Sequence, residues 1–211
     1  MINIRDIADE LRSALDETNS VREEAIKLSR ETIRLSANSI RASHRGDYDD
    51  ACELKEKART KVLETKELLK NNGEVYYTGY VQDAQKEYTE SELTYAIIRE
   101  LPFPKRCELG VEAPAYLNGI AEAIGETRRH TLDLVRAGDM ERAQRALNIM
   151  DEVFYVLITF DYPDAVTCGI RRQTDMVRGV LEKTRGEITI LFQQQKLEKT
   201  LHEAVNKLYN E

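Results

Sequence analysis

Apolar residues recur every three or four positions along most of the chain, which is the spacing of one face of an α-helix. Short turn signals, mostly glycine, asparagine and proline, divide this pattern into segments. No stretch alternates apolar and polar residues between turn signals in the way that a pair of strands would. The pattern therefore predicts an all-α bundle of about seven helices and no sheet.

The turn signals place the ends of the predicted helices. Gly46 ends the first helix and Gly73 closes the turn after the second, while a Pro-Phe-Pro run stops the third because proline lacks the amide hydrogen that a helix needs. Pro114 suits the first turn of the fourth helix, Asp164 is placed to cap the sixth, and Gly186 is expected to separate it from the seventh. The predicted segments are Ile4 to Arg45, Asp49 to Leu69, Val75 to Glu100, Pro114 to Arg136, Asp139 to Thr159, Asp164 to Arg185, and Glu187 to Leu208.

The chain has 211 residues, enough for one large domain or two small ones. No Ser/Gly-rich linker or low-complexity tract interrupts the charged helical pattern, so a single domain over residues 1–211 is the simplest prediction. The amino terminus lacks the basic start and apolar core of a signal peptide. The most apolar run, Val153 to Phe160, is far shorter than the roughly 20 residues of a bilayer span. A soluble, cytoplasmic protein is expected.

The three cysteines, Cys52, Cys107 and Cys168, are solitary and lack the spacing of metal ligands. Their odd number argues against a disulfide framework. Since cysteine is one of the most often buried residue types, all three are expected to be buried structural thiols.

Four glutamates form two close pairs, Glu87 with Glu90 and Glu122 with Glu126. Residues three or four apart share one face of a helix. Two such pairs on neighbouring helices would make an oxygen-only pocket of the kind that Mg²⁺ or Mn²⁺ prefers, which predicts a metal-assisted hydrolysis site. The alternative is that the acids face solvent and pair locally, for example with Lys86 and Arg129.

Two glycines flank the second acid pair inside a predicted helix. Gly119 and Gly125 each cost about 1 kcal/mol of helix stability relative to alanine. Their presence predicts that the backbone of another helix approaches the chain beside Glu122 and Glu126.

A second group of residues is basic, although the formal net charge of −7 would by itself disfavour a nucleic-acid partner. Five cations on the first helix share one face and form a stripe about 27 Å long at a rise of 1.5 Å per residue. Such a stripe matches the regular negative charge of a phosphate backbone, although an ordinary solvated face is the alternative. The basic stripe is Lys27, Arg30, Arg34, Arg41 and Arg45; His44 lies beside it, and Arg171, Arg178 and Arg185, with Arg172 alongside, could extend it.

The same residues carry a family resemblance. Tyr116 to Glu126 resembles the TRAX motif, in which a Tyr-Leu-x-Gly start leads to two acids four apart, the second in Gly-Glu. Glu87 to Glu90 resembles that family's Glu-Tyr-x-Glu, and Lys27 to Arg30 with Ser43 to Gly46 resembles its first helix. From about residue 20 to 205 the chain is similar to the translin/TRAX superfamily, in particular to its single-subunit archaeal type.

The resemblance implies a seven-helix subunit in a hollow homo-octameric shell, with RNA inside and Mg²⁺-dependent endoribonuclease activity on single-stranded or short RNA. It also implies that the four glutamates are the catalytic, metal-binding cluster, for Mg²⁺ or Mn²⁺. TRAX usually has aspartate where this chain has Glu122, and because Mg²⁺ demands tight geometry the longer side chain could change metal preference or rate. The alternatives are a translin-like shell that binds single-stranded RNA or DNA without cutting it, and a helical scaffold that binds neither.

Overall fold

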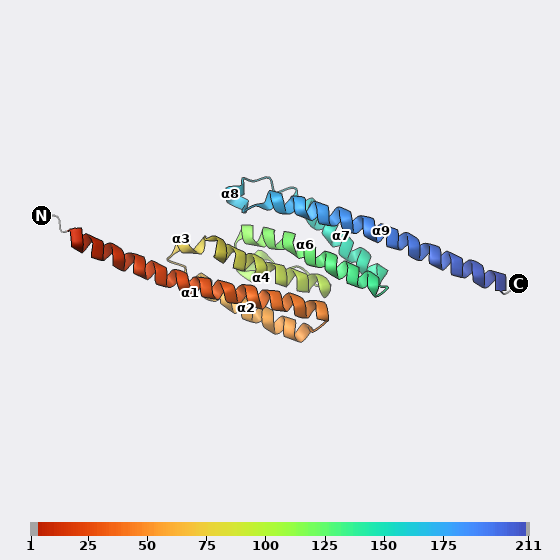
Figure 1. Ribbon diagram of the computed structural model, residues 1–211, viewed down its shortest axis with the longest axis horizontal. Coiled ribbons are helices and arrows are strands. Elements are labelled where there is room, and N and C mark those ends of the chain that lie inside the picture. The colour runs from red at the N-terminus through yellow and green to blue at the C-terminus, as the bar shows by residue number, and fades with distance from the viewer. Residues whose placement is uncertain (1–3, 210–211) are drawn as a thin grey trace.

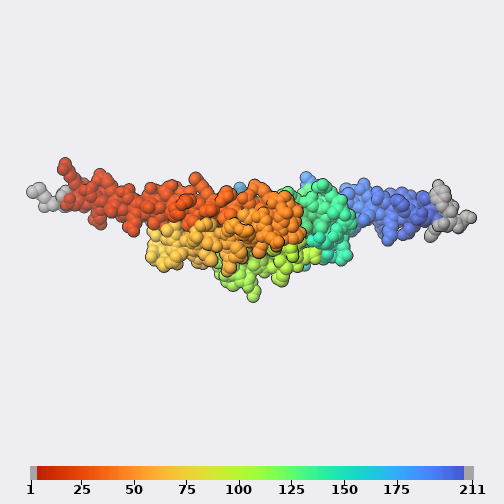
Figure 2. Space-filling model, turned by 90° about the horizontal axis from the view of Figure 1, so that it is seen from below, coloured from red at the N-terminus to blue at the C-terminus, as the bar shows by residue number. Residues whose placement is uncertain are grey.

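The computed structural model describes the backbone of residues 4–209 and the side chains of residues 4–206. Over this range the chain is helical and contains no strand, as the sequence predicts. Two long helices, α1 (Ile4–Arg45) and α9 (Ile170–Tyr209), project beyond the rest of the molecule in opposite directions (Figure 1). Figure 2 shows the same two projections from another side, one at each end of an elongated body.

The central bundle consists of α2 (Tyr48–Leu68), α4 (Gly79–Ile98), α6 (Ala113–Arg136) and α7 (Met140–Leu157) with the inner parts of α1 and α9. Neighbouring helices pack in the order α2, α1, α4, α6, and both α7 and α9 pack against α6 and each other. Single-turn helices lie in the connections: α3 (Gly73–Tyr76), α5 (Arg106–Leu109) and α8 (Asp164–Thr167). These short turns make nine helices in the described range instead of about seven. That residues 1–211 form a single domain stays a prediction.

The predicted break at Gly186 is wrong, because α9 runs through it without interruption. A glycine inside a helix costs only about 1 kcal/mol, and the buried residues Leu181 and Ile188 on either side hold this part of α9 against the core. The break lies instead at Cys168 and Gly169, whose φ angles of 52° and 94° end α8 in the left-handed conformation. Residues 164–209 are therefore a short turn followed by one long helix.

Apolar side chains form separate buried clusters on the two sides of the contact between α4 and α6. One cluster joins α6, α7 and α9 and includes Ile124, Met150 and Ile188. Another joins α1, α2 and α4 and includes Val62 and Tyr88. The face shared by α4 and α6 thus lies between two packed cores, which hold its side chains in fixed positions.

Gly119 lets α6 approach α4 more closely than any other residue would. A Cβ atom added at Gly119 would lie 2.6 Å from Thr89 Cβ and 2.8 Å from the Lys86 carbonyl oxygen, both on α4. The predicted approach of a second backbone is therefore correct at Gly119. At Gly125 it is wrong, since no atom lies within 4 Å of an added Cβ there.

All three cysteines are exposed, so the expectation of buried thiols is wrong. At Cys52 the reason is helical geometry: Ala51 faces the core, and the next residue is turned away from it by about 100°. In the range 4–209 no helix has the length and apolar character that a bilayer crossing requires. The cytoplasmic location stays a prediction.

Candidate functional site

Three carboxylates meet at the contact between α4 and α6. Glu87 and Glu90 of α4 and Glu122 of α6 each offer one oxygen atom, and these oxygens lie within 4.8 Å of one another. All three residues are partly buried. Gly119, one turn before Glu122, allows the close approach of the two helices that brings the carboxylates together. The structure thus joins three of the four predicted glutamates across two helices, and we call these three the glutamate cluster.

Glu126 lies one turn after Glu122 and is held by a residue from α1. Its Oε2 atom is 2.6 Å from His44 Nε2 and 3.7 Å from Arg129 Nη1. The hydrogen bond from His44 is the main reason that the pKa of Glu126 lies below its ordinary value. The His44 side chain is only 3% exposed. The structure therefore places His44 beside the glutamate cluster and not on the basic surface of α1.

Two further side chains bind Glu122. Lys86 Nζ donates to Glu122 Oε1 at 2.9 Å and also lies 3.7 Å from Glu87 Oε1. Gln173, near the start of α9, donates its Nε2 to the same Glu122 oxygen at 3.1 Å. Helices α1, α4, α6 and α9 therefore all contribute to the site. Sequence reasoning missed Gln173, which is 51 residues from Glu122 and has no local signal.

The carboxylates perturb one another because they are crowded and poorly solvated. Burial, reinforced by the charges of Glu87, Glu122 and Glu126, raises the pKa of Glu90 to about 8. Burial also raises the pKa of Glu87, although the nearby Lys86 opposes the rise. Acids that are buried together and shifted in this way are typical of functional sites. The cluster has a deficit of positive charge that a bound cation would relieve.

We expect the Glu90→Gln substitution to stabilise the protein above neutral pH when divalent metal is absent. The folded-state pKa of Glu90, about 8, lies above its ordinary value of 4.5, so the folded state holds this proton more tightly. The free energy of unfolding should therefore fall as pH rises from 4.5 through 8, by at most a few kcal/mol at about 1.4 kcal/mol per pKa unit. Urea unfolding in EDTA at pH 5 and pH 8.5 measures this difference.

The matched control for Glu90→Gln is Asp133→Asn, which removes an exposed acid from α6. It should keep the wild-type dependence of stability on pH. Equal pH dependence in wild type and Glu90→Gln would contradict the raised pKa.

The five cations of the basic stripe are all exposed on one face of α1. Three of them have acidic partners: Lys27 lies 3.4 Å from Glu24, Arg34 lies 3.6 Å from Glu31, and Arg45 lies 2.8 Å from Asp47. Glu24, Glu31 and Asp47 therefore balance part of the positive charge of the stripe. These pairs are exposed and contribute little to stability, so phosphate groups could replace the acids as partners.

The arginines of α9 are exposed too, and their surroundings differ. Arg171 pairs with Asp161 at 2.5 Å, and Arg178 lies 3.7 Å from Asp175 with its guanidinium over the Phe154 ring. Arg172 lines a cavity of about 150 Å³ that is also lined by Lys86, Glu122 and Gln173. Arg172 is therefore the arginine of this group that shares a cavity with a member of the glutamate cluster.

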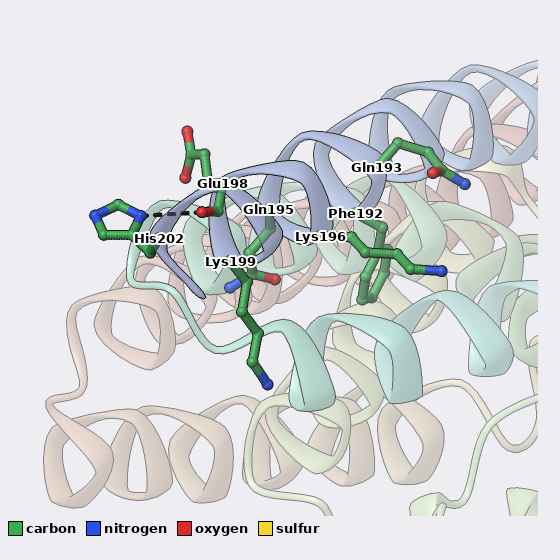
Figure 3. A pocket seen from close by; sticks show the side chains of 7 residues that line it. All are labelled: Phe192, Gln193, Gln195, Lys196, Glu198, Lys199 and His202. Carbon is green, nitrogen blue, oxygen red and sulfur yellow. Dashed lines mark hydrogen bonds between the residues drawn. The ribbon is translucent and has the colours of Figure 1, made fainter. Parts of the chain in front are cut away.

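Two larger pockets lie away from the glutamate cluster. One, of about 710 Å³, lies on the projecting part of α9, and the residues described around it all belong to that helix (Figure 3). The hydrogen bond drawn there joins His202 to the Glu198 backbone oxygen, and Lys196 and Lys199 extend from the helix surface. A second, of about 460 Å³, is an apolar groove between α6 and α7. Neither gathers converging titratable groups as the glutamate cluster does, so the cluster is the candidate site.

Comparison with known proteins places the chain in a family. No protein-family model matches it. It is 34% identical over 154 residues to the uncharacterized protein MJ0175 of Methanocaldococcus jannaschii, which covers 72% of this chain and 69% of that protein. Among solved structures, the crystal structure of AfC3PO matches with a TM-score of 0.80 and 31% identity, over 87% of this chain and 96% of that one.

Two other C3PO structures give the same result. The AfC3PO–duplex RNA complex matches with a TM-score of 0.75 and 32% identity, over 87% of this chain and 95% of that one. The structure of apo-NeC3PO has a TM-score of 0.79 and 25% identity, over 87% of this chain and 96% of that one. The C3PO structures belong to the translin/TRAX family, and identity above 30% over nearly the whole of AfC3PO indicates common descent as well as a common fold. The chain therefore belongs to the translin/TRAX superfamily.

Proposed function

We propose that this protein is a metal-dependent endoribonuclease that cuts single-stranded or short RNA inside a homo-oligomeric shell. The observation that carries the proposal is the glutamate cluster, whose three oxygens lie within 4.8 Å of one another. Mg²⁺ binds oxygen at about 2.1 Å, so ligands on opposite sides of the ion are about 4.2 Å apart. The donor atoms are all carboxylate oxygens, which suit Mg²⁺ or Mn²⁺ better than a softer metal. Small side-chain movements would therefore fit the cluster around one ion.

Each acid would have a defined part in the reaction. Glu87, Glu90 and Glu122 would hold the cation, which when bound would acidify a water molecule and offset negative charge on the phosphoryl oxygens. Glu126 lies at the edge of the cluster, where the hydrogen bond from His44 keeps it ionised and fixes its orientation. In that position its carboxylate would accept a hydrogen bond from the attacking water and orient it.

Exposed cations would hold the RNA backbone by phosphate contacts, which fix position without reading sequence. Arg172 is placed to contact the strand near the cluster, since it lines the cavity that Glu122 also lines. The basic stripe on α1 would contact a longer stretch of RNA, and Arg171 and Arg178 would add to it. The structure of AfC3PO with duplex RNA supports RNA as the ligand. Basic surfaces turned to the inside of a shell would let an acidic protein hold RNA.

The projecting ends of α1 and α9 support an assembly, which the family resemblance implies is an octamer. Both ends leave large apolar side chains in water, with Leu15 at 68% and Leu197 at 60% exposure. Helices with an apolar stripe of this kind usually bury it against another surface. The residues concerned are Ile4, Ile7, Leu11 and Leu15 on α1, and Ile190, Leu197, Leu201 and Val205 on α9. Neighbouring subunits of the shell would cover them.

Cleavage of an end-labelled single-stranded RNA tests the proposal. We expect cutting in Mg²⁺ or Mn²⁺, none in EDTA, and full recovery when excess metal is restored. Undiminished cutting in EDTA would overturn the role of the metal.

A second candidate function is a translin-like shell that binds RNA without cutting it. One observation favours it: Lys86 already neutralises Glu122 at 2.9 Å, so part of the glutamate cluster is paired without a metal. Tight RNA binding with no cutting in any metal would establish this second function.

A further inference from the structure

We propose that Lys86 competes with the metal for the glutamate cluster. Its ammonium group occupies the Glu122 side of the cluster when no metal is bound. A bound divalent cation displaces the ammonium group into the adjoining cavity, where the lysine can bind an RNA phosphate. This inference rests on the proposed function, because it concerns the same cluster. It adds a coupling between metal binding and RNA binding that the glutamates alone do not provide.

The contacts of Lys86 show why it would compete with a cation. Lys86 Nζ lies 2.9 Å from Glu122 Oε1 and 3.7 Å from Glu87 Oε1, so it contacts two of the three carboxylates of the cluster. An ion bound to that same Glu122 oxygen at about 2.1 Å would lie no more than about 5 Å from the ammonium nitrogen. Two positive charges at this distance repel each other strongly where solvent is scarce. The side chains of Lys86 and Glu122 are only 20% and 22% exposed.

Lys86 carries its positive charge at neutral pH. Lysine is ordinarily protonated at this pH, and Lys86 Nζ lies within 4 Å of three carboxylates, those of Asp83, Glu87 and Glu122. Because the ammonium group is positively charged, it must either move away from a bound cation or weaken the binding of that cation.

The cavity that Lys86 lines can accept the displaced ammonium group. Lys86 lines the cavity of about 150 Å³ described above, which has room for about five water molecules at about 30 Å³ each. Asp83, which also lines the cavity, has its Oδ1 atom 3.8 Å from Lys86 Nζ. The flexible lysine side chain can therefore turn from Glu122 into the cavity without a change in the backbone. An ion pair with Asp83, whose side chain is 64% exposed, would be weak and would leave the ammonium group available to a phosphate.

Arg172 gives this movement a consequence for RNA. It lines the same cavity, so a displaced Lys86 and Arg172 would present two cationic groups to one phosphate. Before the metal binds, the Lys86 charge is taken up by Glu122 and contributes little to RNA binding. Metal binding and RNA binding would then strengthen each other, and thermodynamic linkage requires the effect to be mutual.

Isothermal titration with Mn²⁺ in the absence of RNA tests the competition. Lys86→Met should bind Mn²⁺ about tenfold more tightly than the wild type, a factor that corresponds to about 1.4 kcal/mol. Lys57→Met, which removes an exposed lysine paired with Glu53 on α2, is the matched control and should bind as the wild type does. Glu122→Gln, which keeps Glu87 and Glu90, should bind Mn²⁺ more weakly than the wild type. Thermal melts establish that each variant is folded, and Lys86→Gln replaces Lys86→Met if the latter is not.

Binding of a fluorescent single-stranded RNA in EDTA tests the second part. Lys86→Met should bind this RNA with wild-type affinity, because Lys86 is engaged by Glu122 when no metal is bound. Weaker binding by Lys86→Met in EDTA would show that Lys86 already contacts RNA and would overturn its release by metal.

The outcomes separate this inference from the proposed function. If the wild type binds Mn²⁺ and Lys86→Met binds it no more tightly, the competition is wrong and the metal site stands. If neither protein binds Mn²⁺, both the metal site and the competition are wrong. If only Lys86→Met binds Mn²⁺, the competition is correct and is strong enough to exclude the metal from the wild type.

Discussion

Replacing Glu122 with glutamine is expected to slow RNA cleavage by about a hundred- to a thousandfold, the usual cost of removing one preorganised charged or polar group from a catalytic site. Glutamine has nearly the same shape, and its carbonyl oxygen can still accept the hydrogen bonds that Lys86 and Gln173 donate to Glu122. The packing of α4 against α6 should therefore survive. What is lost is one of the negative charges that would hold and orient the cation, so cleavage should stay slower even when Mg²⁺ is raised to saturation.

The rate of a single turnover on end-labelled RNA, at saturating Mg²⁺, measures this loss. Asp133→Asn is again the matched control, because it removes the same charge from an exposed position on the same helix. It should cleave at the wild-type rate, and both variants should keep the wild-type assembly size in size-exclusion chromatography. Equal rates in the two variants would place the chemistry outside the glutamate cluster.

Adding one methyl group at Gly119 is expected to damage both stability and the metal site. In Gly119→Ala the new Cβ would lie 2.8 Å from the Lys86 carbonyl oxygen, and this backbone atom can move only if α4 moves with it. Overpacking of this kind costs about 1–3 kcal/mol. For a chain of this size that corresponds to a fall in Tm of roughly 2–12 °C. Moving α4 away from α6 would also separate Glu87 and Glu90 from Glu122, so Mn²⁺ should bind more weakly.

Gly125→Ala is the matched control on the same helix. Its added Cβ would meet no atom within 4 Å, so alanine should improve helix stability by up to about 1 kcal/mol. Thermal melts and Mn²⁺ titrations of the two variants give the comparison. A Gly119→Ala protein as stable as Gly125→Ala would show that the contact between α4 and α6 is looser than the structure indicates.

The sequence was most informative where structure is local. Helical periodicity and turn residues placed the ends of α1, α2 and α6 to within a residue or two, because these features act over one or two turns. The prediction of a helix break at Gly186 failed, because a glycine can either end a helix or be tolerated within one. Tertiary contacts decide between these two outcomes, and they cannot be inferred from nearby residues.

The candidate site shows the same limit. Spacing predicted that Glu87 and Glu90 share a face, and the glycine beside the second pair correctly indicated the close approach at Gly119. Spacing could not predict that Lys86 would turn toward the neighbouring helix, or that His44 would bond to Glu126 across 82 residues. Such pairings depend on how whole helices pack.

The opposite directions of the α1 and α9 projections restrict how copies of the chain can associate. The two projecting helix ends lie at opposite ends of an elongated body (Figure 1). Each leaves apolar side chains exposed, and a contact that covers one end leaves the other exposed. A pair of copies joined through one end of each therefore still has two exposed apolar ends. Association of this kind continues until the subunits close into a ring or shell, or it runs on as an open filament. If copies of the chain associate through these ends, the angle between the two ends of one copy decides whether the assembly is finite.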